Sequence, residues 1–164
     1  MRNKATNRQT RNYDAVIATP LGRLGVMLTD DALGDVSFMG DTAALHGPRT
    51  AAVKRVCRQL RSYFSNPLYS FHVPLSLSGT AFQQRVWREM QRIPAGRTLS
   101  YGALAKKLAT SARAVGNACR ANPVPIVVPC HRVVAAQGAG GFMGKRSGNA
   151  LRLKHWLLEH ERQR

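Results

Sequence analysis

Three prolines, Pro123, Pro125 and Pro129, lie within seven residues of one another, in and just before the apolar run VPIVVPCHRVV. Proline lacks a backbone donor and biases the residue before it toward extended geometry, so no regular helix can pass through this segment. We expect a stiff, extended segment that ends at Cys130. Adjacent side chains of such a segment point to opposite faces, so a contact between Cys130 and His131 needs a turn or a bridging water.

The chain before this segment begins with a strand pattern. Apolar residues alternate at Leu24, Val26 and Leu28, and turn signals at residues 20–22 and 30–31 separate short strands of a meander. Apolar residues then recur at the spacing of one helix face, at Val53, Val56, Cys57, Leu60 and Phe64.

These patterns predict a helix over residues 51–64, followed by an extended segment over residues 69–79. We therefore expect residues 13–77 to form a small N-terminal α/β domain. Residues 1–12 have the composition of a flexible basic tail.

Near Ser78 the pattern changes from strands to helices, so residues 78–164 are predicted to form a helical C-terminal domain. Thr80 and Gln83 have capping-box spacing at the start of its first helix, and Pro94 ends that helix. Two short helices then follow, capped by Ser100 and Ser111 and joined by a tight turn, as in a helix-turn-helix.

The second of these short helices carries three unusually small residues, Ala112, Ala114 and Gly116. Small side chains let a backbone approach a large partner closely, although close packing against another helix would use them equally well. A last helix is predicted from about Asn149, with an apolar face at Leu153, Trp156, Leu157 and His160. Glu161 lies near the same side, where a carboxylate needs a partner unless the helix end is frayed at the surface.

The chain is strongly basic, with 25 Lys and Arg against 8 Asp and Glu and a net charge of +17. The excess is larger in residues 78–164, at +12, than in residues 1–77, at +5. Such a charge attracts polyanions, so nucleic acid is the first candidate partner and an anionic membrane surface the second.

No apolar stretch approaches the roughly 20 residues that span a bilayer. Three cysteines do not suggest a disulfide framework, so we expect a reduced, cytoplasmic protein. We expect neither a metal nor another cofactor, because the histidines lack ligand spacing with a cysteine.

Cysteine is a good nucleophile only as the thiolate. A histidine can remove the thiol proton, directly or through one water, and a carboxylate can orient that histidine. Cys130, His131 and Glu161 could supply these roles, whereas Cys57 and Cys119 are predicted to be core residues.

Four segments carry a specific resemblance: FQQRVW, IPAGRTLSYGALA, RAVGNACRANPVPIVVPCHRVV and WLLEHE. In this order they resemble the O6-alkylguanine-DNA alkyltransferases, also called methylated-DNA–protein-cysteine methyltransferases. The match is strong over residues 79–164 and loose over residues 13–77. It implies an α+β fold, in which a small RNase H-like α/β domain precedes a winged helix-turn-helix-like domain.

The resemblance also implies a function in DNA repair. Cys130 would take the alkyl group from O6-methylguanine, and from O4-methylthymine, in a single turnover that inactivates the protein. The partner would be double-stranded DNA carrying O6-alkylguanine, bound through its minor groove by a monomer.

Roles for individual residues follow from the same resemblance. His131 would act as the base through a water, Glu161 would hold it, and Asn122 would brace the active-site turn. Tyr101 would donate a hydrogen bond to the departing guanine. Arg113 would fill the space that the flipped base leaves, in a helix whose small residues Ala112, Ala114 and Gly116 enter the groove.

The substrate pocket would include Val128, Pro129, Phe142 and Met143, with the Val128 and Cys130 carbonyls accepting from the guanine amine. The sequence departs from the family pattern at Phe142, because many members carry a Gly-Tyr segment there. It also has a few extra residues around KRSGN. The range of alkyl groups beyond methyl is therefore open.

Two other classes of protein remain alternatives. A helix-turn-helix regulator would explain the charge and the helices, but it gives no reason for Cys130 beside His131 together with Asn122 and Glu161. A cysteine hydrolase would use the same nucleophile, but it needs a water-labile intermediate and gives no reason for the charge.

Overall fold

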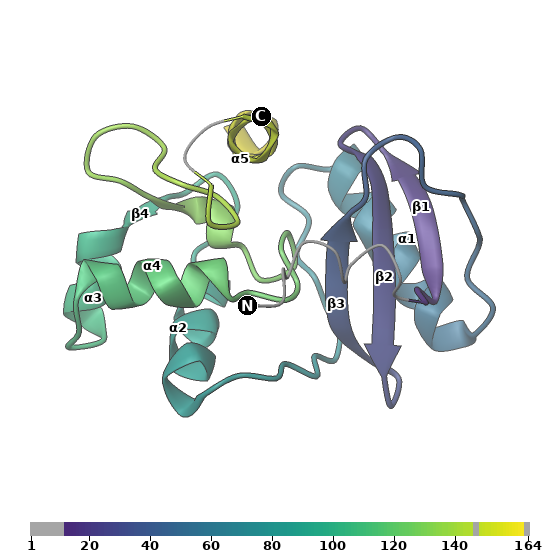
Figure 1. Cartoon of the computed structure of the whole chain (residues 1–164), viewed down its shortest axis with the longest axis horizontal. Coiled ribbons are helices and arrows are strands. Elements are labelled where there is room, and N and C mark those ends of the chain that lie inside the picture. Colours follow the sequence, from purple (N-terminus) through teal and green to yellow (C-terminus); the bar gives the residue numbers. More distant parts are fainter. Residues whose placement is uncertain (1–11, 146–147, 163–164) are drawn as a thin grey trace, which may run out of the picture. The chain divides into compact units, whose positions relative to one another are not determined.

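The computed structural model describes residues 12–145 and 148–162 (Figure 1). The predicted basic tail lies outside these residues except for Asn12, and so do two of the extra loop residues, Arg146 and Ser147. Backbone contacts divide the chain into two units.

The first unit comprises the described residues up to Ser65 together with Phe71–Leu77. Its three strands form an antiparallel sheet of order β1-β2-β3, with β1 at Ala15–Thr19, β2 at Gly22–Thr29 and β3 at Ala32–Phe38. Ile17 pairs with Leu24, and Val26 pairs with Val36. The predicted meander is thus confirmed.

Helix α1 (Ala51–Ser65) packs against β1 and β2 in the first unit. Its buried apolar face contains Val53, Val56, Cys57, Leu60 and Tyr63. The predicted helix is confirmed, but Tyr63 rather than Phe64 is the buried aromatic residue. Tyr63 follows Leu60 by three positions and therefore stays on the inward face.

The second unit comprises Asn66–Ser70 and the chain from Ser78 onward. Its helices are α2 (Ala81–Gln91), α3 (Tyr101–Lys107), α4 (Ala112–Arg120) and α5 (Asn149–Arg162). The predicted caps are present: Thr80 and Gln83 form a reciprocal capping box, and the hydroxyls of Ser100 and Ser111 accept from Ala103 and Ala114. A sheet followed by helices makes the fold α+β, as predicted.

Helices α3 and α4 contact each other across a turn at residues 108–111, where Ala109 has a φ of 52°. The left-handed backbone at Ala109 reverses the chain between the two helices. Trp87 of α2 is fully buried and donates its indole N–H to the Ala118 carbonyl of α4 at 2.9 Å. The predicted helix-turn-helix is therefore fixed to the core of its unit.

The segment before Cys130 is not extended, so that prediction is wrong. Residues 123–128 form turns, and Cys130–Arg132 form a short 3₁₀-helix, η1. The chain turns at Ile126, whose φ is 77°. Proline excludes regular helix, as expected, but it does not exclude a turn that side chains stabilise.

Two short strands connect η1 to the helix pair. Strand β4 (Leu99–Ser100) precedes α3, and strand β5 (Val133–Val134) follows η1. They pair in parallel, Leu99 with Val133 and Ser100 with Val134. This pairing holds the start of α3 next to the segment that carries Cys130.

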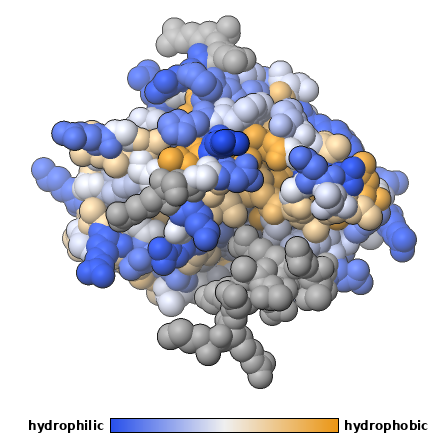
Figure 2. All heavy atoms as spheres, turned by 45° about the horizontal axis from the view of Figure 1, so that its top comes forward, coloured by the Kyte–Doolittle hydropathy of each residue, from blue (hydrophilic) through white to orange (hydrophobic). Residues whose placement is uncertain are grey.

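Within residues 12–145 and 148–162, no helix combines the length and the apolar character that a bilayer crossing requires. On the face drawn in Figure 2, hydrophilic side chains project around smaller apolar areas.

Candidate active site

Asn122, at the end of α4, holds the turn that leads to Cys130. Its buried side chain accepts from the Val124 backbone N–H at 3.0 Å and donates to the Val128 carbonyl at 2.8 Å. Val128 also donates its backbone N–H to the Val124 carbonyl at 3.0 Å. These bonds close the turn around Ile126, which is buried in a left-handed conformation that a β-branched residue rarely adopts.

Cys130 begins η1 directly after this turn, and only 5% of its surface is exposed. Its backbone N–H donates to the Val128 carbonyl at 2.9 Å. Burial raises the pKa of the Cys130 thiol, while Asn122 and the charge of Lys154 act in the opposite direction. The resting thiol therefore keeps its proton, and transfer chemistry requires a base.

His131 is the histidine next to Cys130 in η1. It is fully buried, and its Nε2 lies 2.7 Å from the Oε1 atom of Glu161. Burial lowers the pKa of His131 despite the Glu161 carboxylate beside it, so the ring is neutral. Since a carboxylate only accepts, Nε2 carries the proton and Nδ1 is the basic nitrogen. Among the described residues, Nδ1 has no hydrogen-bond partner.

Glu161 is held by more than His131. Arg132 donates Nε to one carboxylate oxygen at 3.0 Å and a terminal nitrogen to the other at 2.9 Å. The Gly96 backbone N–H lies 3.4 Å from the oxygen that receives Nε. Burial alone would raise the pKa of Glu161, but hydrogen bonds from His131 and Arg132 outweigh it and hold that pKa well below its usual range.

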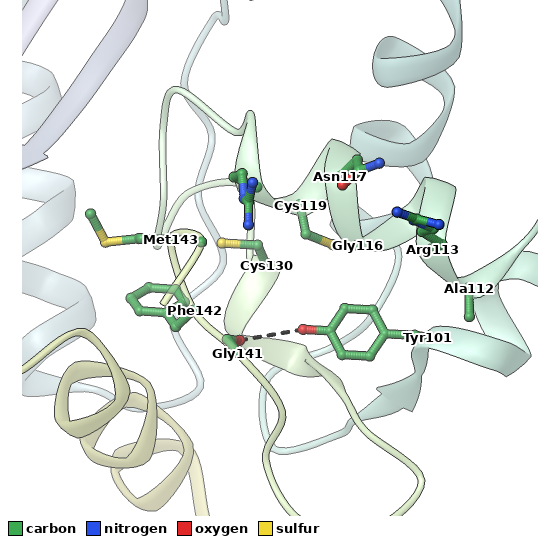
Figure 3. A pocket seen from close by; sticks show the side chains of 12 residues that line it. Tyr101, Ala112, Arg113, Gly116, Asn117, Cys119, Cys130, Gly141, Phe142 and Met143 are labelled. Carbon is green, nitrogen blue, oxygen red and sulfur yellow. Dashed lines mark hydrogen bonds between the residues drawn. The ribbon is translucent and has the colours of Figure 1, made fainter. Parts of the chain in front are cut away.

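An open pocket of about 670 Å³ lies beside Cys130. This volume is typical of small-molecule sites. Helix α4 lines it with Ala112, Arg113, Gly116, Asn117, Cys119 and Arg120, and the remaining lining residues are Tyr101, Cys130, Gly141, Phe142, Met143 and Gly144. Figure 3 shows the Cys130 side chain between Cys119 and the Phe142–Met143 segment, with Tyr101 on another side of the pocket.

Cys119 also lines this pocket, but it is a poor nucleophile. Burial, with a smaller contribution from the neighbouring Cys130, raises the pKa of its thiol to about 12. Its Sγ lies 3.6 Å from the sulfur of Met90. Cys130 is thus the pocket cysteine that has a histidine base within the same short element.

Lys154 of α5 is a fully buried cation beneath the pocket. Its Nζ donates to the carbonyls of Val133 at 2.7 Å and Gly141 at 2.8 Å, and it lies 3.5 Å from the Tyr101 hydroxyl. The Tyr101 hydroxyl also donates to Gly141 at 3.3 Å (Figure 3). Burial lowers the pKa of Lys154 to about 8. Lys154 therefore joins α5, β5 and the pocket loop.

The loop wall of the pocket is a tight turn at residues 142–145. Phe142 and Lys145 exchange both backbone hydrogen bonds, at 2.8 and 2.9 Å. Met143 and Gly144 have φ values of 52° and 77°, as in the two-residue turns of hairpins. Phe142 is buried, so its ring anchors the turn, while Met143 is partly exposed at the pocket.

Some of the predicted site residues do not line the pocket. Val128 and Pro129 are buried behind Cys130 and are absent from the lining, as is Ala114. The Val128 carbonyl already accepts from Asn122 and Cys130. The Cys130 carbonyl accepts from the backbone N–H of Val133.

Sequence reasoning missed three charged residues of the site: Arg132, Lys154 and Arg120. Lys154 precedes Leu157 by three positions and Glu161 by seven, which places all three on one face of the last helix. This spacing could have identified Lys154 as an inward-facing residue. Arg120 follows Arg113 by two helical turns, which brings both to the same pocket wall. No comparable spacing signal points to Arg132.

Comparisons with known proteins agree with this geometry. A model of the family described as "6-O-methylguanine DNA methyltransferase, DNA binding domain" matches residues 81–163. The methylated-DNA–protein-cysteine methyltransferase of Methanosarcina acetivorans is 36% identical over 91% of this chain and 97% of its own. The constitutive Bacillus subtilis methyltransferase is 34% identical over 92% of this chain and 96% of its own.

Solved structures give the same result. The O6-methylguanine methyltransferase of Mycobacterium tuberculosis has a TM-score of 0.76 and 36% identity, covering 91% of this chain and 92% of that one. A structure of the M. tuberculosis protein in complex with DNA has a TM-score of 0.75 and 38% identity, covering 90% and 91%. This chain belongs to the methylated-DNA–protein-cysteine methyltransferase family, as the sequence motifs predict.

Proposed function

We propose that this protein repairs DNA by moving the methyl group of O6-methylguanine, and of O4-methylthymine, onto its own Cys130. The observation that carries the proposal is the arrangement of Cys130 at a pocket with the buried His131–Glu161 pair in the same unit. Membership of the family and the DNA complex of the M. tuberculosis relative support it.

The reaction begins with removal of the Cys130 proton. His131 takes it at Nδ1, through a water, and the ionised Glu161 stabilises the resulting imidazolium at Nε2. Arg132 keeps the carboxylate fixed in that position. Burial raises the pKa of Cys130, and the charge of Lys154 offsets part of that rise, which favours the thiolate.

The thiolate sulfur then attacks the methyl carbon, and the bond between that carbon and O6 breaks. The electron pair of the broken bond passes to the guanine, and Tyr101 stabilises the departing base by donating a hydrogen bond to it. Tyr101 releases its bond to Gly141 in order to do this. The guanine then takes a proton at N1 from water, and His131 returns the proton of Cys130 to water. The product is a thioether, which neither His131 nor water hydrolyses, so each molecule reacts once.

The target base is stacked inside duplex DNA and must be flipped into the pocket. Helix α4 suits entry into the minor groove, because Ala112 and Gly116 on its pocket side are small and let the helix backbone approach DNA closely. Arg113 is exposed on the same helix and can occupy the space of the flipped base. One chain supplies all of these groups, so we expect a monomer to act, in the reducing cytoplasm.

Mass spectrometry after incubation with DNA containing O6-methylguanine tests the proposal. We expect one added methyl group per protein molecule, located on Cys130, and no further turnover. A Cys130→Ser variant is the control and should gain no methyl group. Repeated turnover, or methyl groups on Cys57 or Cys119, would overturn the proposal.

A further inference from the structure

The exposed face of α1, in the first unit, is a continuous row of positive charge. The four cations of this row are all exposed: Lys54, Arg55, Arg58 and Arg61. We call them the α1 cation row. The helix contains no acidic residue, and its opposite face is buried against the sheet.

Within the described part of the first unit, no acidic side chain pairs with this row. Among residues 12–145 and 148–162, no hydrogen bond or ion pair involves the side chain of any of the four cations. The carboxylates that form ion pairs there are Glu89, Glu159 and Glu161, all in the second unit. The aspartates of the first unit lie on or beside its strands.

The spacing of the row makes it unfavourable for folding. Lys54 and Arg58 are four positions apart, and Arg58 is three positions from both Arg55 and Arg61. Like charges at these spacings repel each other and destabilise a helix. The row therefore destabilises α1 in the free protein, and an anionic partner bound to it would relieve the repulsion.

We infer that the α1 cation row is a second DNA-binding surface, which contacts the phosphate backbone without reading bases. Lys54 and Arg61 are seven residues apart, or about 10 Å along the helix. One DNA strand presents a phosphate about every 3.4 Å of the duplex axis, so the row can face about three phosphates. The inference rests on DNA as the substrate in the proposed function, but it does not require alkyl transfer.

The structure favours DNA over a lipid surface. A helix that binds a membrane inserts its apolar face between the lipids. The apolar face of α1 is already used in the core, where Val53, Val56 and Leu60 are at most 4% exposed. The exposed face carries the four cations and the small residue Ala51, and Phe64 near the end of the helix is only partly exposed.

The test measures binding to an undamaged, fluorescently labelled duplex as salt is increased. In the variant K54Q/R55Q/R58Q/R61Q, we expect weaker binding. The fall of log affinity with log salt should be less steep, its slope reduced in magnitude by roughly 3. The melting temperature should not fall, because repulsion within α1 is relieved. Because the duplex is undamaged, failure of methyl transfer would not affect this result.

Removal of four charges also lowers the net charge from +17 to +13, which weakens DNA binding at any location. A second variant controls for this by adding D30N, D31N, D41N and E159Q, all at exposed positions. This variant restores the net charge but not the α1 cation row. We expect the salt dependence of its duplex affinity to stay as weak as in the first variant. A third variant, R55K/R58K/R61K, keeps the charges and should bind as the unaltered protein does.

Recovery of the original slope in the recharged variant would overturn the inference, because net charge alone would then explain binding. Unchanged duplex binding in the first variant would overturn it as well. If that variant instead lost binding to vesicles containing phosphatidylserine, the row would serve a lipid surface.

Discussion

Lys154 shows how much one side chain contributes to this site. A fully buried ammonium group is costly unless it is paired, and here the Val133 and Gly141 carbonyls accept hydrogen bonds from it. The same group lies near the Tyr101 hydroxyl, and its charge partly offsets the rise that burial causes in the pKa of Cys130. One residue thus connects the position of the pocket loop with the reactivity of the nucleophile.

The lowered pKa of Lys154 predicts a pH dependence of stability. The folded state releases this proton near pH 8, whereas the unfolded state keeps it until about 10.5. Between these values the unfolded state binds more protons, so stability should rise with pH by on the order of 3 kcal/mol from this group.

The buried cysteines, whose pKa values are raised, lower stability in the upper part of this range in any variant that keeps them, so Lys154 is isolated by a difference between two proteins. Denaturant unfolding of the unaltered protein and of a Lys154 variant between pH 7.5 and 10.5, a range of roughly 3 pH units, measures that difference. Lys154→Met removes the titrating group but keeps a long side chain, so its stability relative to the unaltered protein should fall across the window. A difference between the two proteins that does not change with pH would contradict the prediction.

At the scale of elements, the site is a meeting point of α4, η1 and α5 around a turn. Helix α4 provides a pocket wall, η1 provides Cys130 and His131, and α5 provides Lys154 and Glu161. These elements are held together by buried polar contacts as well as by apolar packing. Variants in different elements should therefore affect different steps of the reaction.

Arg113 of α4 should affect flipping rather than chemistry. A free base such as O6-benzylguanine needs no flipping, so Arg113→Ala should slow repair of duplex DNA strongly and leave reaction with the free base nearly unchanged. Single-turnover rates on both substrates measure this. Arg113→Lys should restore little activity, because it lacks the planar guanidinium. Full recovery with lysine would indicate an ordinary phosphate contact.

Asn122 should affect both substrates, because it shapes the turn before Cys130. Asn122→Ala leaves the buried Val124 N–H without its partner and removes one donor to Val128. We expect a loss of about 2 kcal/mol in the free energy of unfolding. Transfer from duplex DNA and from the free base should slow equally.

The exposed Asn117 provides a control for this experiment. Asn117→Ala should change the free energy of unfolding by no more than roughly 0.5 kcal/mol. If Asn122→Ala slowed the duplex reaction alone, Asn122 would act in DNA binding rather than in shaping the turn.

At the scale of the whole molecule, the dominant property is a net charge of +17 on 164 residues. Binding to duplex DNA should therefore be mainly electrostatic, with similar affinity for different sequences. Affinity should fall about a thousandfold between 50 and 200 mM salt if about six phosphates are contacted. Anisotropy titrations over this range measure it, and a flat salt response would show that the charge serves another purpose.

Local signals in the sequence were enough to predict the helices α1 to α5 and the N-terminal meander. The capping box of Thr80 and Gln83 and the serine caps at Ser100 and Ser111 act within one turn of helix, so they can be recognised without the fold. The motif around Cys130 likewise indicated the family, because its residue types and their order are specific.

The family motifs implied that Glu161 holds His131, but only the tertiary structure showed the contacts of Arg132 and Lys154. Arg132 and Glu161 are 29 residues apart, and Lys154 donates to Val133 from 21 residues away. The compact turn at Ile126 also depends on distant support, because a left-handed β-branched residue is unfavourable by itself. Burial and pairing of this kind arise between segments that meet only in the fold, so no local pattern encodes them.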